Sequence, residues 1–168
     1  MVVVAMVGIL ATLAVYGVKK YLNSSKSSEA IQMIGSIKAA QESYRSETFT
    51  YLDVSGTKSV SSLSTFYPTT APGNSAVQWG DVSTAVGARW QTLGVVADAP
   101  VRFAYGSAAG SSADAVAAAG TAVSGWPTAS TQPWYVVRAV SDLDGDSTYS
   151  NFVSGSFTGQ IFIDKEGE

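Results

Sequence analysis

The residues best suited to chemistry are three aspartates at alternate positions, Asp142, Asp144 and Asp146. Carboxylates gathered on one tight loop offer the hard oxygen ligands that calcium prefers. The segment is not an EF-hand, because its glycine stands at 145 and the twelfth position of such a loop would be Val153. Two interpretations stay open, a calcium site built from these aspartates or an acidic turn between two strands.

Other routes to catalysis have little support in the composition. The sequence contains neither histidine nor cysteine, which excludes histidine-based triads, thiolate nucleophiles and Cys/His zinc sites. The glycine-containing segment at 106–110 has no lysine after it, so it does not form a phosphate loop. We therefore expect a protein that is not an enzyme.

Charge and aromatic content limit the classes of binding partner that we expect. The net charge is −3 and there is no run of lysine or arginine, so we expect no nucleic-acid partner. The chain has 4 tryptophans. We expect them to fill the core or pack under loops, and an aromatic binding groove is the less favoured alternative.

The first eighteen residues, 1–18, carry no charge, and Lys19 and Lys20 follow directly. As a helix this run would be about 27 Å long, close to the thickness of a bilayer's hydrocarbon core. No basic residue precedes the run, and it is longer than the apolar region of a cleaved signal peptide. The pattern therefore predicts a membrane anchor or a rod buried inside an assembly.

A helix that is apolar on all sides cannot be covered by packing one face on its own head. Copies of such a helix can cover one another, and small residues let their backbones approach closely. Glycine also weakens a helix, so we expect some irregularity between Gly8 and Asn23. The candidate residues for the core of such an assembly are Met1, Val4, Ala5, Gly8, Ile9, Ala11, Thr12, Val15 and Gly17.

The following segment is predicted to continue the helix as an amphipathic half. Ala30, Ile34, Ile37 and Tyr44 recur at helical spacing and should pack against the head. Gln41 belongs to the polar set that is expected on the opposite face.

The remainder of the chain is predicted to form a loop region and a β-sheet. A short helix is expected within 82–93, ending at Gly94, and the segment 107–125 reads as a flexible surface loop. Strands are expected at 101–105, 134–140, 149–154 and 159–164, forming an antiparallel meander.

Together these features predict an α+β fold in which a long N-terminal helix packs on a β-meander of about four strands. The expected segments are a hydrophobic stem at 1–22, the amphipathic half of the helix at 23–50, a variable αβ-loop region at 51–100 and the sheet at 101–168.

The N-terminal third resembles a known family. The run Met1-Val-Val-Val-Ala-Met-Val-Gly-Ile-Leu-Ala11, the Ser-rich step and the segment Ala40-Gln-Glu-Ser-Tyr44 resemble the N-terminal helix of type IV pilins and type II secretion pseudopilins. That helix opens in the family with Phe-Thr-Leu-Ile-Glu-Leu, which this sequence lacks. No residue here takes the role of the family's glutamate, which is thought to pair with a neighbouring subunit's terminal amine.

The resemblance implies a structural subunit of an extracellular type IV pilus that serves adhesion, motility or surface attachment. It implies a helical filament of identical subunits, an inner-membrane precursor and partners in the pilus or secretion assembly machinery. Two alternatives stay open: a pseudopilin of a type II secretion system, and a monomeric membrane-anchored binding module.

Overall fold

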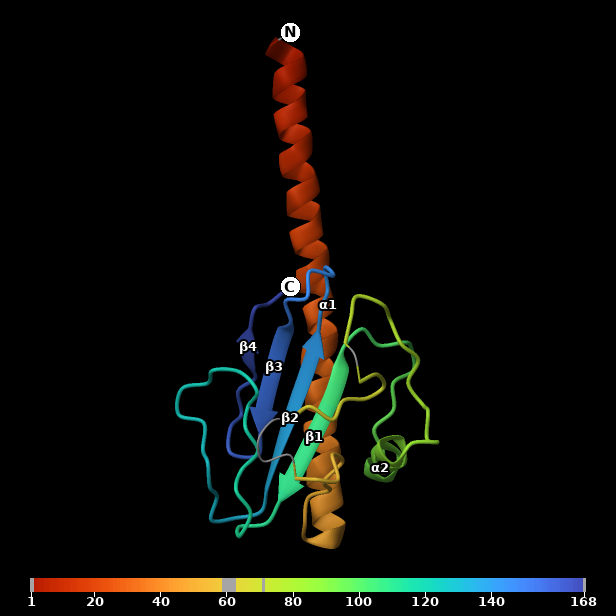
Figure 1. Cartoon of the computed structure of the whole chain (residues 1–168), viewed down its shortest axis with the longest axis vertical. Coiled ribbons are helices and arrows are strands. Elements are labelled where there is room, and N and C mark those ends of the chain that lie inside the picture. Colours follow the sequence, from red (N-terminus) through yellow and green to blue (C-terminus); the bar gives the residue numbers. More distant parts are fainter. Residues whose placement is uncertain (1, 59–62, 71, 168) are drawn as a thin grey trace.

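The computed structural model describes residues 2–58, 63–70 and 72–167. Over these residues the chain forms a long N-terminal helix, a short second helix and a four-stranded sheet. The predicted α+β fold is confirmed: one half of the long helix lies along the sheet, and the other half projects beyond the head (Figure 1). The elements are α1 (Val2–Thr48), α2 (Ala85–Leu93), β1 (Ala104–Gly110), β2 (Trp134–Ser141), β3 (Ser150–Gly155) and β4 (Phe162–Asp164).

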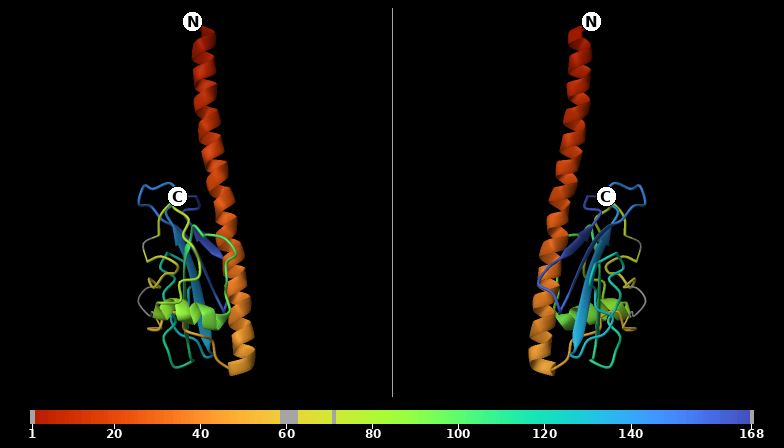
Figure 2. Two further views of the ribbon diagram at one scale, coloured as in Figure 1. Left: turned by 90° about the vertical axis from the view of Figure 1, so that its right-hand side faces the viewer. Right: turned by 90° about the vertical axis from the view of Figure 1, so that its left-hand side faces the viewer.

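The sheet is the predicted antiparallel meander, with strand order β1-β2-β3-β4. Both of its faces are covered. One face packs on α1, which runs along it in the side views of Figure 2. On the other face lies a second apolar cluster that joins residues of the sheet to the loop between β1 and β2. The strands therefore read as nearly continuous buried runs instead of alternating ones.

The first strand lies further along the chain than the sequence predicts. It was expected at 101–105 and is found at Ala104–Gly110, so the predicted loop at 107–125 is wrong over its first four residues. The small residues of β1 face the bulky residues of β2, and Gly110 pairs with Trp134. A Cβ at Gly110 would lie 2.6 Å from Cζ2 of Trp134, so the absence of a side chain permits the pairing.

Helix α1 is continuous, in contrast to the irregularity expected between Gly8 and Asn23. One glycine weakens a helix by about 1 kcal/mol, which the hydrogen bonds of the turns on either side offset. The helix ends at Thr48, and the next residue, Phe49, takes a left-handed conformation with φ of 63°. Its N–H closes the helix by donating to the carbonyl of Arg45 at 2.8 Å.

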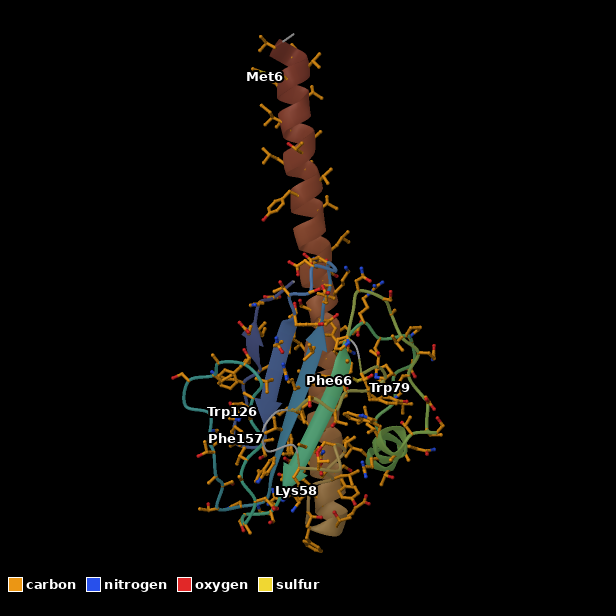
Figure 3. The ribbon with its side chains drawn as sticks, viewed as in Figure 1. Met6, Lys58, Phe66, Trp79, Trp126 and Phe157 are labelled. Carbon is orange, nitrogen blue, oxygen red and sulfur yellow. The ribbon has the colours of Figure 1, made fainter. Side chains whose placement is uncertain are left out.

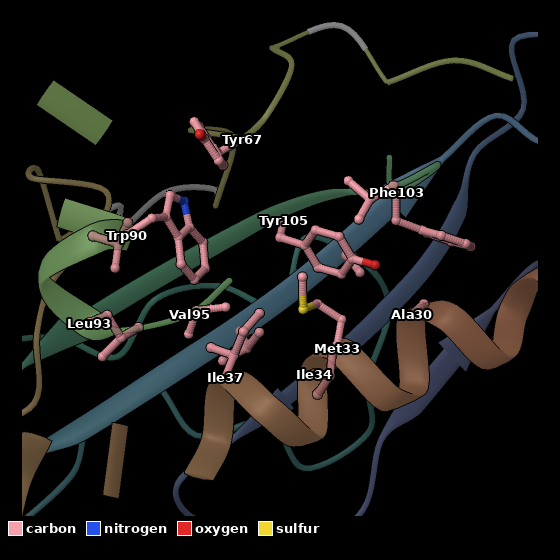
Figure 4. Close-up of a cluster of buried hydrophobic side chains, with 14 of the residues drawn as sticks. Ala30, Met33, Ile34, Ile37, Tyr67, Trp90, Leu93, Val95, Phe103 and Tyr105 are labelled. Atoms are coloured by element: carbon pink, nitrogen blue, oxygen red, sulfur yellow. The ribbon is translucent and has the colours of Figure 1, made fainter. Parts of the chain in front are cut away.

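Helix α2 forms within the predicted range and carries clear signals at both ends. The hydroxyl of Thr84 accepts a hydrogen bond from the N–H of Gly87, which caps the N-terminus. Gly94 ends the helix, as predicted, in the left-handed conformation with φ of 77°. This helix helps position Trp90 and Leu93 in the core that includes the buried face of α1 (Figure 4).

Candidate functional site

The most unusual surface of the molecule is the stem, residues 1–22, of which the structure describes 2–22. Its large apolar side chains are exposed on every side: Val4 is 73% exposed and Ile9 is 61% exposed. Figure 3 shows these side chains, Met6 among them, pointing away from the helix where no other part of the chain lies. The stem thus presents an apolar surface that the chain itself does not cover.

The residues predicted for a filament core all lie on this surface, except Met1, which is outside the described residues. Val4, Ala5, Gly8, Ile9, Ala11, Thr12, Val15 and Gly17 are all exposed. Gly8 and Gly17 have no neighbouring heavy atom that an added Cβ would meet within 4 Å. The small residues therefore form depressions on the surface of the helix, where another helix can approach closely.

Beyond its first turn, the backbone of the stem is satisfied within the helix. Its backbone is helical throughout, and the hydroxyl of Thr12 donates to the carbonyl of Ile9 at 2.8 Å. In hydrocarbon such internal satisfaction is required, because no water is present to bond backbone or hydroxyl groups. Within the described residues, α1 is long and apolar enough to cross a membrane.

The second half of α1, in contrast to the stem, packs against the head. The structure places Ala30, Ile34 and Ile37 in the core with no exposed surface (Figure 4). Tyr44 packs partly buried against the same cluster. These residues hold the helix against the sheet. The stem is therefore attached to the head by one uninterrupted rod.

Two polar residues of this half bind the head in ways that periodicity does not reveal. Gln41, expected on the outward face, is fully buried. Its side-chain NH₂ group donates to the carbonyl of Leu52 and to the hydroxyl of Ser107, and its side-chain oxygen accepts from the N–H of Leu52. Lys38 donates to the hydroxyl of Ser154 and to the carbonyl of Thr158. Burial lowers the pKa of this lysine, and the nearby Glu42 carboxylate opposes that effect.

Glu29 adds a third polar attachment between α1 and the sheet. One carboxylate oxygen accepts from the N–H of Arg102 at 2.8 Å and from the N–H of Phe103 at 3.4 Å. It also accepts from the hydroxyl of Tyr105 at 3.3 Å. Burial raises the pKa of Tyr105, and the Glu29 carboxylate raises it further, so this phenol stays a donor at every physiological pH.

The three aspartates do come together in the loop between β2 and β3. Asp142, Asp144 and Asp146 each offer a carboxylate oxygen, and these atoms lie within 4.8 Å of one another. Asp142 is buried and accepts from the N–H groups of Gly145 and Ser147, and the other two carboxylates each accept one backbone N–H. These bonds account for the turn by themselves. Calcium binding stays a prediction.

The four tryptophans lie mostly inside the head, as core packing predicts. Trp90 and Trp134 are fully buried, Trp79 is nearly so, and Trp126 is half-buried against Phe157. Trp79 and Trp90 meet edge to face, with ring centroids 5.4 Å apart, beside Tyr67.

Comparison with known proteins finds no relative: no protein-family model matches the chain, and neither curated proteins nor solved structures give a significant match. The fold and the stem define an α+β protein with a long apolar N-terminal helix, compatible with membrane anchoring.

Proposed function

We infer that the chain is a structural, pilin-like subunit whose stem packs with the stems of identical chains in the core of a filament. The observation that carries this inference is the contrast within α1. The head covers one face of its second half, whereas the large apolar residues of the stem remain more than half exposed. A covered second half fixes the head on the side of the rod, so stems can bundle while heads face outward (Figure 1).

Two environments can remove the apolar surface of the stem from water. Apolar surface in water is unfavourable by about 25 cal/mol per Å², and the stem carries such surface around its whole circumference. A bilayer removes this cost for a newly made chain. A bundle of stems removes it equally well and adds close packing at Ala5, Gly8 and Ala11. An inner-membrane precursor and an extracellular filament would thus each remove the apolar surface of the stem from water.

The N-terminal pattern supports the same proposal, because its order of apolar run, Ser-rich step and Gln-Glu-Ser-Tyr segment resembles pilins and pseudopilins. In such an assembly the partners would be further copies of this chain and the machinery that extracts it from the membrane. The role of the filament would be adhesion, motility or surface attachment. A pseudopilin would use the same stem in a short periplasmic assembly.

Cysteine cross-linking tests the proposal directly, because the chain contains no cysteine of its own. Val4→Cys would be paired with Gly8→Cys, Ala11→Cys or Val15→Cys, which lie on one helix face one, two and three turns away. In a helical filament the contact between subunits is head to tail. Oxidation of one of these double variants in intact cells should therefore give a ladder of dimers, trimers and higher species.

Two controls define the background level of cross-linking. Val4→Cys alone should stop at dimers, and the double variants in dilute detergent micelles should give no ladder. Electron microscopy of material sheared from the same cells then separates the alternatives. Long filaments support a pilin, and short assemblies with loss of protein export on deletion support a pseudopilin. Solitary chains in lipid would overturn the filament and leave a membrane-anchored binding module.

A further inference from the structure

The two flanks of α1 differ in shape where the helix lies along the sheet. Figure 1 shows β4 on one side of the helix and α2 on the other. On the β4 side a groove of about 460 Å³ lies between α1 and the turn after β3, lined by Lys38, Ala39, Glu42 and residues 155–159 among others. On the α2 side the segment 96–100 forms a ridge beside α1, and four of its five residues are exposed.

The ridge is apolar except for one carboxylate. Val96 is 75% exposed and lines two hollows, one against α1 and one against α2, so it stands between them. Pro100 is exposed as well. Asp98 is the single charged residue of the ridge, and within the described part of the chain it makes no hydrogen bond and no ion pair. Contiguous exposed apolar residues of this kind mark interaction surfaces.

The groove on the opposite flank has the complementary character. Lys38 donates to two neutral oxygens of the head, and no carboxylate of the described residues lies within salt-bridge distance of its ammonium group. Glu42, in the same groove, accepts from the hydroxyl of Tyr51. Phe157 is 39% exposed and supplies an apolar wall. The groove thus offers a cation and an aromatic ring to a partner that brings a carboxylate and apolar side chains.

The symmetry of a filament brings these two flanks together. In a helical assembly the contact is head to tail, so one flank of a subunit meets the opposite flank of the next. The ridge lies beside residues 29–36 of α1, whereas the groove lies beside residues 38–42. These levels differ by about seven residues, or about 10 Å along the helix. Ridge and groove therefore meet only between copies staggered along the rod, and a staggered contact repeats into an open helix instead of a closed ring.

We propose that residues 96–100 of one copy pack into the groove beside Lys38 of the next copy, with Asp98 facing Lys38 and Val96 facing Phe157. This contact rests on the proposed function, because it joins heads whose stems already run parallel. The run 1–18 contains no charge, so stem packing has no charge pair to fix the stagger between neighbours. A charge pair between heads fixes that register and disfavours other pairings.

Cysteine cross-linking of the full chain in intact cells tests the contact. Ala39→Cys and Val96→Cys place thiols at exposed positions on the two surfaces, and the chain has no cysteine of its own. Oxidation of this double variant should give a ladder of dimers, trimers and higher species. The control pair is Ala39→Cys with Tyr149→Cys, which should give no ladder, because Tyr149 is exposed in the loop between β2 and β3 and lies on neither surface.

The stem double variants, oxidised in the same cells, separate this contact from the filament itself. A ladder from the stem pairs without one from Ala39→Cys and Val96→Cys would overturn the contact and leave the filament standing. A ladder from the head pair alone would support the contact and refute the stem bundle. Monomers from both sets of variants would overturn both proposals.

Charge reversal tests the pair of Asp98 and Lys38. Asp98→Lys should lower the yield of sheared filaments about tenfold, because two lysines would then face each other across the contact. Asp144→Lys makes the same change of charge on another exposed carboxylate and should leave the yield unchanged. Combining Asp98→Lys with Lys38→Glu should recover the yield.

A swapped variant that keeps the melting temperature of the head without recovering filaments would overturn the proposal. Lys38→Glu also removes two hydrogen bonds within the head, so the melting temperature is measured first. If the swapped head is unstable, the cross-linking of Ala39→Cys with Val96→Cys decides.

Discussion

The two halves of α1 show how one helix can serve two environments. From Asn23 onward, apolar residues recur at helical spacing, and the residues that form the inner stripe are buried by the chain's own sheet. In the stem, apolar residues occur on every side and none of the described ones is buried. The head thus buries the apolar stripe of the second half. The apolar surface of the stem can be buried only by something outside the chain, either lipid or other stems.

The largest effect is expected from a charge placed in the stem. Leu10→Asp should abolish filament assembly, because an aspartate in the middle of an apolar helix costs about 2.5–3.5 kcal/mol in a membrane and more in a dry bundle. The melting temperature of the head should stay unchanged, since the stem does not contact it. Electron microscopy of sheared material and near-UV circular dichroism in micelles measure the two outcomes, with Leu10→Val as the control. Filaments of normal length from Leu10→Asp would contradict the assigned role of the stem.

The second half of the helix should respond in the opposite way. Ile34→Ala should destabilise the head by about 2–4 kcal/mol, because it opens a cavity in a fully buried site. Thermal unfolding measures this loss. Ile31→Ala is the matched control: Ile31 is 41% exposed on the same helix, so its loss should be below about 1 kcal/mol. Equal losses for both variants would show that the second half is not anchored as described.

The loop between β2 and β3 contains one buried and two exposed aspartates, whose effects on the stability of the head should differ. Asp142→Ala should destabilise it by about 1–2 kcal/mol, because the buried carboxylate accepts two backbone N–H groups. Asp144→Ala should cost less than about 0.5 kcal/mol, since Asp144 is exposed and accepts only one. If the loop is only a turn, the melting temperature is the same with calcium and with chelator. A chelator-sensitive shift that Asp144→Ala removes would establish the calcium site instead.

The smallest expected effect concerns the point where α1 ends. Phe49→Gly should stabilise the head by about 1 kcal/mol, because a left-handed backbone is unfavourable for a side chain with a Cβ and the ring itself is 83% exposed. Glu47→Gly, two residues earlier and inside the helix, should destabilise by about the same amount. Thermal unfolding compares them. A loss of stability in Phe49→Gly would indicate that the ring packs on the head after all.

Local pattern predicted the elements well where one signal dominated. The hydrophobic run predicted the first part of α1, and Gly94 predicted the end of α2. The aliphatic run of β2 predicted a central strand. The resulting α+β arrangement followed from the order of these elements. β1 was misplaced because its Ser, Ala and Gly residues resemble a loop in isolation. Only the bulky partners on β2 make small side chains suitable there.

The polar attachments of α1 could not be predicted by the same means. Gln41 and Glu29 occupy positions that helical periodicity treats as ordinary polar surface. Their contacts depend on backbone groups of Leu52, Arg102 and Phe103, which the fold brings to the helix. A side chain's burial is a property of what lies opposite it, and a one-dimensional pattern does not contain that information.

The sequence by itself determined that residues 1–18 form a segment whose exposure to water is unfavourable, because the absence of charge over this run is a property of composition alone. Tertiary structure decided which parts of the helix the chain covers and which it leaves bare. It also buried the indole N–H of Trp90 without a hydrogen-bond partner. Both outcomes depend on distances between residues far apart in the chain, which only folding sets.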